Sequence, residues 1–412
     1  MKQTAPYAAL DAFVDAHFDE QVRFVQELVR VPTDTPPGNN TPHALRTRAL
    51  LAPMGLDAQA HEVPAAQVHA YGLQSLTNLV VQRRYAPGGR IVALNAHGDV
   101  VPPGEGWTHD PYGAEIADGR LYGRAAAVSK CDFSTFVFAT RALEAAGVPL
   151  AGGIDLLFTY DEEFGGLLGP GWLLEHGLTK PDLEIAAGFA YQVVTAHNGC
   201  LQLEATVHGR MGHAAVPRTA VDALQAANRV LTALYAENTR LEQHRSAVAG
   251  IEHGYVNVGQ IAGGTNTNVV PGKVVLKIDR RMIPEEDAAQ VEAGLRALIE
   301  RAATSLPGVT VEIRRLLLAH AMQPLPGNRP LVDALCRHAS AVFGETIEAS
   351  GTPLYTDARL FSERGIPAVI YGAGPRTVLE SNAKRADEHI VLEDLRRATK
   401  VVARTLLDLL GR

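Results

Sequence analysis

The sequence LFTYDEEFGG, residues 157–166, joins an apolar run to three consecutive carboxylates and two glycines. The apolar run begins at Ile154 and has the composition of a buried β-strand. The end of such a strand is where an open α/β sheet places its ligands. Three adjacent carboxylates repel one another unless a cation lies among them, usually a metal ion and sometimes a lysine or arginine. The stretch therefore predicts either a site that holds a cation or a solvated acidic loop.

The composition limits the classes of function. The chain has 412 residues, 46% of them hydrophobic and 20% charged, and a net charge of −7, so two domains are expected. Its Lys and Arg residues are scattered, which argues against nucleic acid or an anionic membrane as partner. Cys131, Cys200 and Cys336 are far apart and show no metal-finger spacing, which favours a reducing compartment. Because we find neither a signal sequence nor a membrane-spanning run, we expect a cytoplasmic protein.

Two patterns of secondary structure divide the chain. In residues 1–199 and 318–412, strands alternate with helices, which predicts an α/β domain with a mainly parallel sheet. Residues 200–317 instead predict the order β-α-β-β-α-β of a ferredoxin-like domain. Since the α/β pattern resumes after this segment, the ferredoxin-like domain is an insertion.

A second apolar strand, RIVALNAHGDVVP at residues 90–102, also ends in polar groups. Its Asp99 is placed to hold one ring nitrogen of His97, as carboxylates do for metal-binding histidines. If one carboxylate of the Asp-Glu-Glu triplet binds a cation, its neighbour can act as general base on water. Further along, Ser129 and Asp132 predict a capping box at the start of a helix.

These motifs resemble those of the co-catalytic zinc aminoacylases and exopeptidases, a family that includes succinyl-diaminopimelate desuccinylase, acetylornithine deacetylase and carboxypeptidase G. The resemblance runs nearly end to end. It rests on AHGDVVP at 96–102, LYGRAA at 121–126, DEEFG at 161–165, NVVP at 268–271 and TDAR at 356–359. It implies an α/β catalytic domain with an inserted ferredoxin-like lid that forms a homodimer. It also implies hydrolysis of a C–N amide bond in an N-acyl amino acid or small peptide.

The resemblance assigns roles to residues at the strand ends. His97 and Glu163 would be metal ligands, and Asp99 would support His97. Glu162 would be the general base. His213, in the inserted domain, would reach the active site of the partner subunit and help to stabilise the oxyanion.

Substrate contacts are expected from Asn268, Arg281, Thr356 and Arg359, which match positions where the family binds substrate. Arg281 shares a strand face with Asp279, so it can either bind a substrate carboxylate or form a surface ion pair with Asp279. The resemblance therefore implies a small-molecule substrate with a free carboxylate.

Three metal-ligand positions of the family are altered. Val128 stands where the family has its metal-bridging aspartate, and Lys384 stands where it has its C-terminal histidine. The acidic residue after the next strand aligns with Ala187 or its neighbour Gly188, and neither has a side chain that binds metal. Groups that could partly replace these ligands are Asp132, Cys131, His109, His197 and Cys200.

His97 and Glu163 remain as expected ligands. Two ligands do not hold a pair of zinc ions, and a catalytic zinc normally has three protein ligands. We therefore expect at most one divalent metal (Zn, Co or Mn) or none, in an atypical or depleted site.

Lys384 suggests a different source of positive charge. If it keeps the position of the family's histidine, its ammonium would lie against Glu162 and Glu163 and replace part of the metal charge; alternatively, it is a solvated side chain. Two other interpretations follow. The chain could be a metal-independent hydrolase or lyase in which Lys384 or Lys130 supplies the charge. It could also be a catalytically silent relative that binds a small ligand or pairs with an active subunit.

Overall fold

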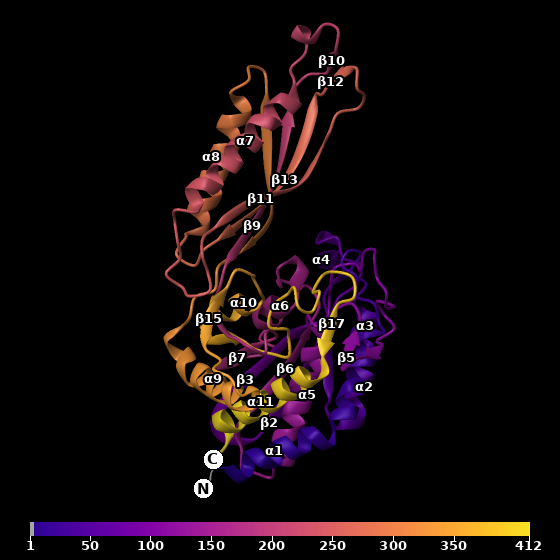
Figure 1. Ribbon diagram of the computed structural model, residues 1–412, viewed down its shortest axis with the longest axis vertical. Coiled ribbons are helices and arrows are strands. Elements are labelled where there is room, and N and C mark those ends of the chain that lie inside the picture. Colours follow the sequence, from indigo (N-terminus) through magenta and orange to yellow (C-terminus); the bar gives the residue numbers. More distant parts are fainter. Residues whose placement is uncertain (1–3) are drawn as a thin grey trace. The chain divides into compact units, whose positions relative to one another are not determined.

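The computed structural model describes residues 4–412, which form two compact units (Figure 1). Unit 1 contains residues 4–195, 324–350 and 356–412, and unit 2 contains residues 196–323 and 351–355. The predicted insertion, residues 200–317, lies inside the main segment of unit 2. The short segment 351–355 adds to unit 2 a piece of chain that the sequence pattern did not indicate. None of the helices in residues 4–412 is both long and apolar enough to cross a bilayer.

The main sheet has eight strands in the order β1-β2-β6-β3-β7-β16-β8-β15. In that order they are β1 (Ala58–Glu62), β2 (Thr77–Arg84), β6 (Ala151–Thr159), β3 (Ala86–His97), β7 (Leu183–Ala186), β16 (Ala368–Ile370), β8 (Val193–His197) and β15 (Ala349–Thr352). The four middle strands, from β6 to β16, are parallel. Strands β2 and β8 flank them in antiparallel pairing. The expected α/β fold with a mainly parallel sheet is confirmed, and its antiparallel pairs lie toward the edges.

Helix α5 (Lys130–Ala145) is buried along most of its length because the sheet and other helices surround it. It contacts β3 and β6 of the sheet and α1 (Thr4–Ala16), α2 (Phe18–Val29) and α11 (Leu392–Leu410). Its buried residues lie on most sides of the helix and include polar ones such as Lys130, Asp132 and Thr140. Phe133 anchors it to the sheet by stacking on Phe158, with ring centroids 4.4 Å apart.

The shorter elements of unit 1 complete the fold. They are α3 (Thr41–Leu51), α4 (Ala65–Ala70), α6 (Pro170–Glu175), α9 (Arg329–Phe343), α10 (Ala358–Ser362) and the 3-10 turns η1 (Ala52–Met54), η2 (Glu162–Phe164) and η4 (Pro326–Asn328). A small separate sheet has the order β17-β5-β4, made of β17 (His389–Val391), β5 (Arg120–Tyr122) and β4 (Ile116–Ala117). This small sheet ties the C-terminal loop before β17 to the segment that leads into α5.

The predicted capping box at the start of α5 is wrong. Ser129 occupies the N-cap, but its side chain makes no capping hydrogen bond; instead its hydroxyl donates to the backbone oxygen of His97 at 2.9 Å. The Asp132 carboxylate is buried and accepts from the backbone N–H of Ala373 at 2.7 Å. Ser129 and Asp132 therefore bond to β3 and to the chain after β16, and not to the backbone of the first turn of α5.

Unit 2 has a four-stranded antiparallel sheet in the order β11-β13-β9-β14. These strands are β11 (Tyr255–Gly263), β13 (Lys273–Met282), β9 (Gly199–His208) and β14 (Thr310–Ala319), and helices α7 (Ala223–Leu241) and α8 (Ala288–Thr304) pack on them. The alternating burial along β9 matches its alternating sequence, so the apolar face is the one under the helices. The predicted ferredoxin-like order is confirmed.

An additional two-stranded ladder extends one end of unit 2 (Figure 1). It pairs β10 (Gly212–His213) with β12 (Val269–Val270), and the 3-10 turn η3 (Pro217–Thr219) follows β10. The ladder holds the loop that contains His213 against the chain just after Asn268.

Candidate active site

The two predicted strand ends meet at one edge of the main sheet. Strands β3 and β6 are parallel neighbours, and His97 is paired with Thr159, so the residues that follow both strands lie together. After β6 the chain forms the η2 turn, which ends at Gly165 with φ 100° and Gly166 with φ 73°. These positive φ angles favour glycine. The two glycines of the opening stretch therefore let the chain reverse immediately after Glu162 and Glu163.

The Asp99 carboxylate fixes this turn. It is fully buried, and its two oxygens accept from the backbone N–H groups of Glu162 at 3.3 Å and Glu163 at 3.0 Å. His97 lies beside it, with Nδ1 3.1 Å from the Asp99 backbone oxygen and 3.4 Å from Oδ1. The predicted proximity of Asp99 and His97 is present, but the main hydrogen bonds of the carboxylate hold the turn.

Glu162 faces the other side of the His97 ring, with Oε2 4.0 Å from Nε2. Burial opposes a charge on His97, but the carboxylates of Glu162, Asp99 and Glu163 outweigh it and raise the pKa of His97 to about 10. Burial raises the pKa of Glu162 to about 7, with the His97 and Lys384 charges opposing the rise. A carboxyl group with a pKa near 7 is suited to general-base catalysis at neutral pH.

Lys384 lies against the carboxylate pair. Its Nζ donates to Glu163 Oε2 at 2.7 Å, which confirms the predicted contact with Glu163. The Lys384 side chain is 52% exposed, whereas that of Glu163 is 10% exposed. Burial opposes the charge on Lys384, but the charges of Glu163 and Glu162 raise its pKa above the ordinary value.

A second carboxylate, Glu388, holds the loop of Lys384 in place. Glu388 is 1% exposed and accepts from Arg124 Nη1 at 2.6 Å. It also accepts from the backbone N–H groups of Ala127 at 3.2 Å, Val128 at 3.4 Å and Lys384 at 3.3 Å. The buried Arg124–Glu388 ion pair therefore connects Val128 and Lys384, two of the positions where the family's metal ligands are replaced. Sequence reasoning missed this pair, although Arg124 lies within a quoted motif.

Asp161 does not join its two neighbours. It is 1% exposed and its Oδ2 accepts from the backbone N–H of Leu168 at 2.6 Å. Burial raises the pKa of Asp161 to about 8, and the nearby Asp99 charge adds to the rise. Of the three consecutive carboxylates, only Glu162 and Glu163 face His97 and Lys384, because the strand end turns Asp161 toward the following loop.

The remaining donors do not fit a metal centre. Val128 and Ala187 offer no donor side chain, and Glu163 is bonded to Lys384. Within residues 4–412, no group of three or more His, Cys, Asp and Glu side chains is arranged to hold a metal ion.

The other candidate ligands are engaged elsewhere. His109 Nδ1 lies 2.9 Å from Glu115, and its ring stacks on Tyr122. The thiol of Cys131 donates to the backbone oxygen of Ala127 at 3.3 Å. His197 Nδ1 lies 2.8 Å from the backbone oxygen of Asn198, and the Cys200 thiol donates to Asp279 Oδ2 at 3.4 Å.

Unit 2 brings His213 and Asn268 together and separates both from Arg281. The backbone N–H of Ala214 donates to the backbone oxygen of Asn268 at 3.0 Å, next to the β10–β12 ladder. Arg281 lies at the far end of β13 from this ladder. From Lys273 to Arg281 the strand rises about 26 Å, at roughly 3.3 Å per residue.

Arg281 forms the ion pair with Asp279 that the sequence left open. Its Nε donates to Asp279 Oδ1 at 2.7 Å, and its guanidinium lies 5.5 Å from the centre of the Tyr355 ring. The ion pair and the ring hold the guanidinium in one orientation. Binding of a substrate carboxylate by Arg281 stays a prediction.

In unit 1, Arg359 is 2% exposed. Its guanidinium donates to the Gly165 oxygen at 2.5 Å and to Glu363 at 3.1 Å, so it supports the turn that follows Glu163. The Thr356 hydroxyl accepts from the backbone N–H of Ala358 at 3.3 Å. Substrate contact by Thr356 and Arg359 stays a prediction.

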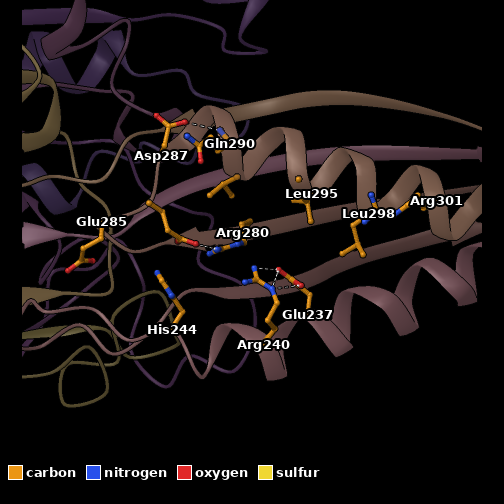
Figure 2. A pocket seen from close by; sticks show the side chains of 13 residues that line it. Glu237, Arg240, His244, Arg280, Glu285, Asp287, Gln290, Leu295, Leu298 and Arg301 are labelled. Atoms are coloured by element: carbon orange, nitrogen blue, oxygen red, sulfur yellow. Dashed lines mark hydrogen bonds and ion pairs between the residues drawn. The ribbon is translucent and has the colours of Figure 1, made fainter.

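A separate cavity of about 450 Å³ lies in unit 2, beside α7 and α8 (Figure 2). Figure 2 shows the Arg240 guanidinium turned toward Glu237, 3.0 Å from Nε to Oε1. Arg280 is 3% exposed and pairs with Glu286. The guanidinium groups of Arg240 and Arg280 are thus paired with glutamates that line the same cavity, so these two charges are already neutralised.

Comparison with known proteins identifies the family of this chain. Residues 93–408 match the model of peptidase family M20/M25/M40. The chain belongs to this family. It is 28% identical over 406 residues to the succinyl-diaminopimelate desuccinylase of Methylorubrum extorquens (strain PA1), covering 92% of this chain and 96% of that protein.

Two solved structures show the same fold. One is the di-peptidase Dug1p from Saccharomyces cerevisiae, with a TM-score of 0.79 and 13% identity over 98% of each chain. The other is the M20 family metallo-carboxypeptidase Sso-CP2 from Sulfolobus solfataricus, with a TM-score of 0.78 and 19% identity, covering 95% of this chain and 99% of that one. Family membership makes this protein a hydrolytic enzyme that acts on amide bonds.

Proposed function

We propose that this enzyme hydrolyses the C–N amide bond of an N-acyl amino acid or small peptide, with Glu162 as general base. The observation that carries the proposal is the η2 turn, where Asp99 presents Glu162 beside His97 in surroundings that raise the pKa of Glu162 to about 7. The desuccinylase among the relatives supports an N-acyl amino acid as substrate. The di-peptidase and the carboxypeptidase among the solved structures support a small peptide. We propose that it acts in the cytoplasm.

In the proposed reaction, Glu162 takes a proton from water as the water oxygen attacks the amide carbon. The tetrahedral intermediate then loses its C–N bond, and the proton passes from Glu162 to the leaving nitrogen. Asp99 positions Glu162 through the backbone of the turn. Since the donors do not fit a metal centre, we propose that the metal site is depleted, with at most one divalent ion.

For the substrate, we propose that Arg281 binds a free carboxylate together with Asn268 of the partner subunit, since Asn268 lies with His213 at the other end of β13. The Asp279 ion pair and the Tyr355 ring support this role of Arg281 because they hold its guanidinium in place. A guanidinium of fixed orientation suits bidentate binding of a carboxylate.

We further propose a homodimer formed through unit 2, in which His213 of the partner subunit stabilises the oxyanion. Strand β11 is at the edge of its sheet. Tyr255 and Ile261 on β11 and Leu224 and Tyr235 on α7 are 47–53% exposed, so the edge strand and the helix both present large apolar side chains to solvent. The distance along β13 between the His213 loop and Arg281 is consistent with the two acting on substrates in different subunits.

The proposal is tested with a panel of N-acyl amino acids and dipeptides and the variant Glu162→Gln. We expect the variant to lose roughly 10²- to 10⁴-fold in kcat, the usual contribution of a general base. In the wild type, kcat/KM should rise with pH through about 7, because Glu162 must lose its proton to act as base. Glu175→Gln, at the exposed end of α6, is the matched control and should keep full activity. Unchanged turnover in Glu162→Gln would refute the role of Glu162.

A further inference from the structure

The carboxylates of this site already have a cation. Lys384 Nζ lies 2.7 Å from Glu163 Oε2, whereas zinc binds a carboxylate oxygen at about 2.0–2.2 Å. Because a divalent ion on that oxygen would lie next to the ammonium, the two positive charges would repel each other at contact distance. Metal binding to Glu163 Oε2 and the Lys384 contact therefore exclude one another.

Lys384 is also held at this position by its backbone. Its N–H donates to Glu388, which binds Arg124 and the backbone at Val128 in the interior. The lysine is thus anchored by buried groups at one end and by Glu163 at the other. A solvated lysine on the surface would not be held in this way.

His97 is engaged as well. Its Nδ1 faces Asp99, with the backbone oxygen at 3.1 Å, and its Nε2 faces Glu162 at 4.0 Å. Both ring nitrogens therefore point at carboxylate-bearing residues, and no third His, Cys, Asp or Glu completes a metal-binding group with His97 and Glu163 in the described chain.

From these contacts we propose that the Lys384 ammonium takes the place of a metal ion in the site, so that the hydrolysis proceeds without a divalent cation. This rests on the proposed function. The ammonium has three N–H donors, and one is used by Glu163. Since the side chain is 52% exposed, a remaining N–H can donate to the amide oxygen of a bound substrate. As water adds to the carbon and Glu162 removes its proton, this N–H stabilises the negative charge on that oxygen and Lys384 keeps its own proton.

Metal binding is the first test, and it does not depend on a known substrate. Purified full-length protein is analysed for bound metal by mass spectrometry and titrated with Zn²⁺, Co²⁺ and Mn²⁺ by calorimetry. We expect no stoichiometric metal in the wild type and one zinc ion per chain in Lys384→His, which adds a third ligand to His97 and Glu163. Lys384→Met should bind none. Stoichiometric metal in the wild type, or no gain in Lys384→His, would overturn the proposal.

Activity is the second test. Hydrolysis by the wild type should persist in excess chelator, and Lys384→Met should lower kcat by roughly 10²- to 10³-fold with little change in KM. Lys384→Arg, which keeps the charge, should recover part of the loss. The matched control is Lys400→Met, since Lys400 Nζ also lies 2.7 Å from a carboxylate, that of Asp15 on the opposite helix, and this variant should behave as the wild type.

The two tests separate two kinds of failure. Chelator-sensitive hydrolysis with bound metal would overturn the role of Lys384 and leave the amide hydrolase proposal in place. A protein that binds no metal and hydrolyses nothing in the panel would refute the proposed function, while the metal titration of Lys384→His would still decide whether Lys384 excludes the metal.

Discussion

The substitution Arg124→Leu should strongly destabilise this protein. Arg124 is fully buried and Glu388 is 1% exposed, and they are joined by a hydrogen bond of 2.6 Å. Removing one partner of a buried ion pair leaves the other charge without compensation, which costs about 3–5 kcal/mol. The Glu388 carboxylate would keep its backbone donors at Ala127, Val128 and Lys384. Three neutral hydrogen bonds do not replace the charge of a guanidinium. We therefore expect Arg124→Leu to lower the free energy of unfolding by about 3–5 kcal/mol.

The measurement is the free energy of unfolding from urea titration at pH 7, followed by circular dichroism and by tryptophan fluorescence. Fluorescence is informative because the Arg124 guanidinium lies 5.1 Å from the centre of the Trp107 ring. The matched control is Arg141→Leu, whose partner Glu20 lies at 2.9 Å but is 34% exposed. Both side chains of this pair reach solvent, at 18% and 34% exposed, and solvent-exposed pairs contribute only about 0.2–1 kcal/mol. If Arg124→Leu were no more destabilising than Arg141→Leu, the reasoning from burial would be refuted.

Two further predictions concern a buried acid and the dimer. Burial raises the pKa of Asp132 to about 7 from its ordinary 3.8, so the folded state holds a proton that the unfolded state has lost, and stability falls as pH rises from about 4 to about 7. Asp132→Asn mimics the protonated acid. Its free energy of unfolding should therefore exceed that of the wild type at pH 8, by at most about 4 kcal/mol, and equal it at pH 4. Equal free energies of unfolding for the two proteins at both pH values in urea titrations would contradict the raised pKa of Asp132. Tyr235→Lys, on the exposed face of α7, should convert the proposed dimer to a monomer in light scattering, whereas Arg329→Lys at the exposed start of α9 should not.

The sequence by itself determined the architecture and the two strand ends. Apolar runs that alternate with helical patterns specify a mainly parallel sheet, and strict alternation such as Leu201 and Leu203 specifies a sheet with one covered face. These signals are local, so they can be recognised without knowing which segments meet. The parallel pairing of β3 and β6 then follows, and with it the meeting of His97 and Glu162.

The tertiary structure alone decided how the charges are paired. Lys384 and Glu163 are 221 residues apart in the chain, and Glu388 is 260 residues from Val128. The sequence suggested Lys384 as a cation, but only the fold showed which carboxylate it contacts. The fold also turns the side chain of Asp161 away from that of Glu162, although the two residues are adjacent in the chain. The physical reason is that an ion pair depends on distances of a few ångströms in space, and residues far apart in sequence reach such distances only through the packing of the whole unit.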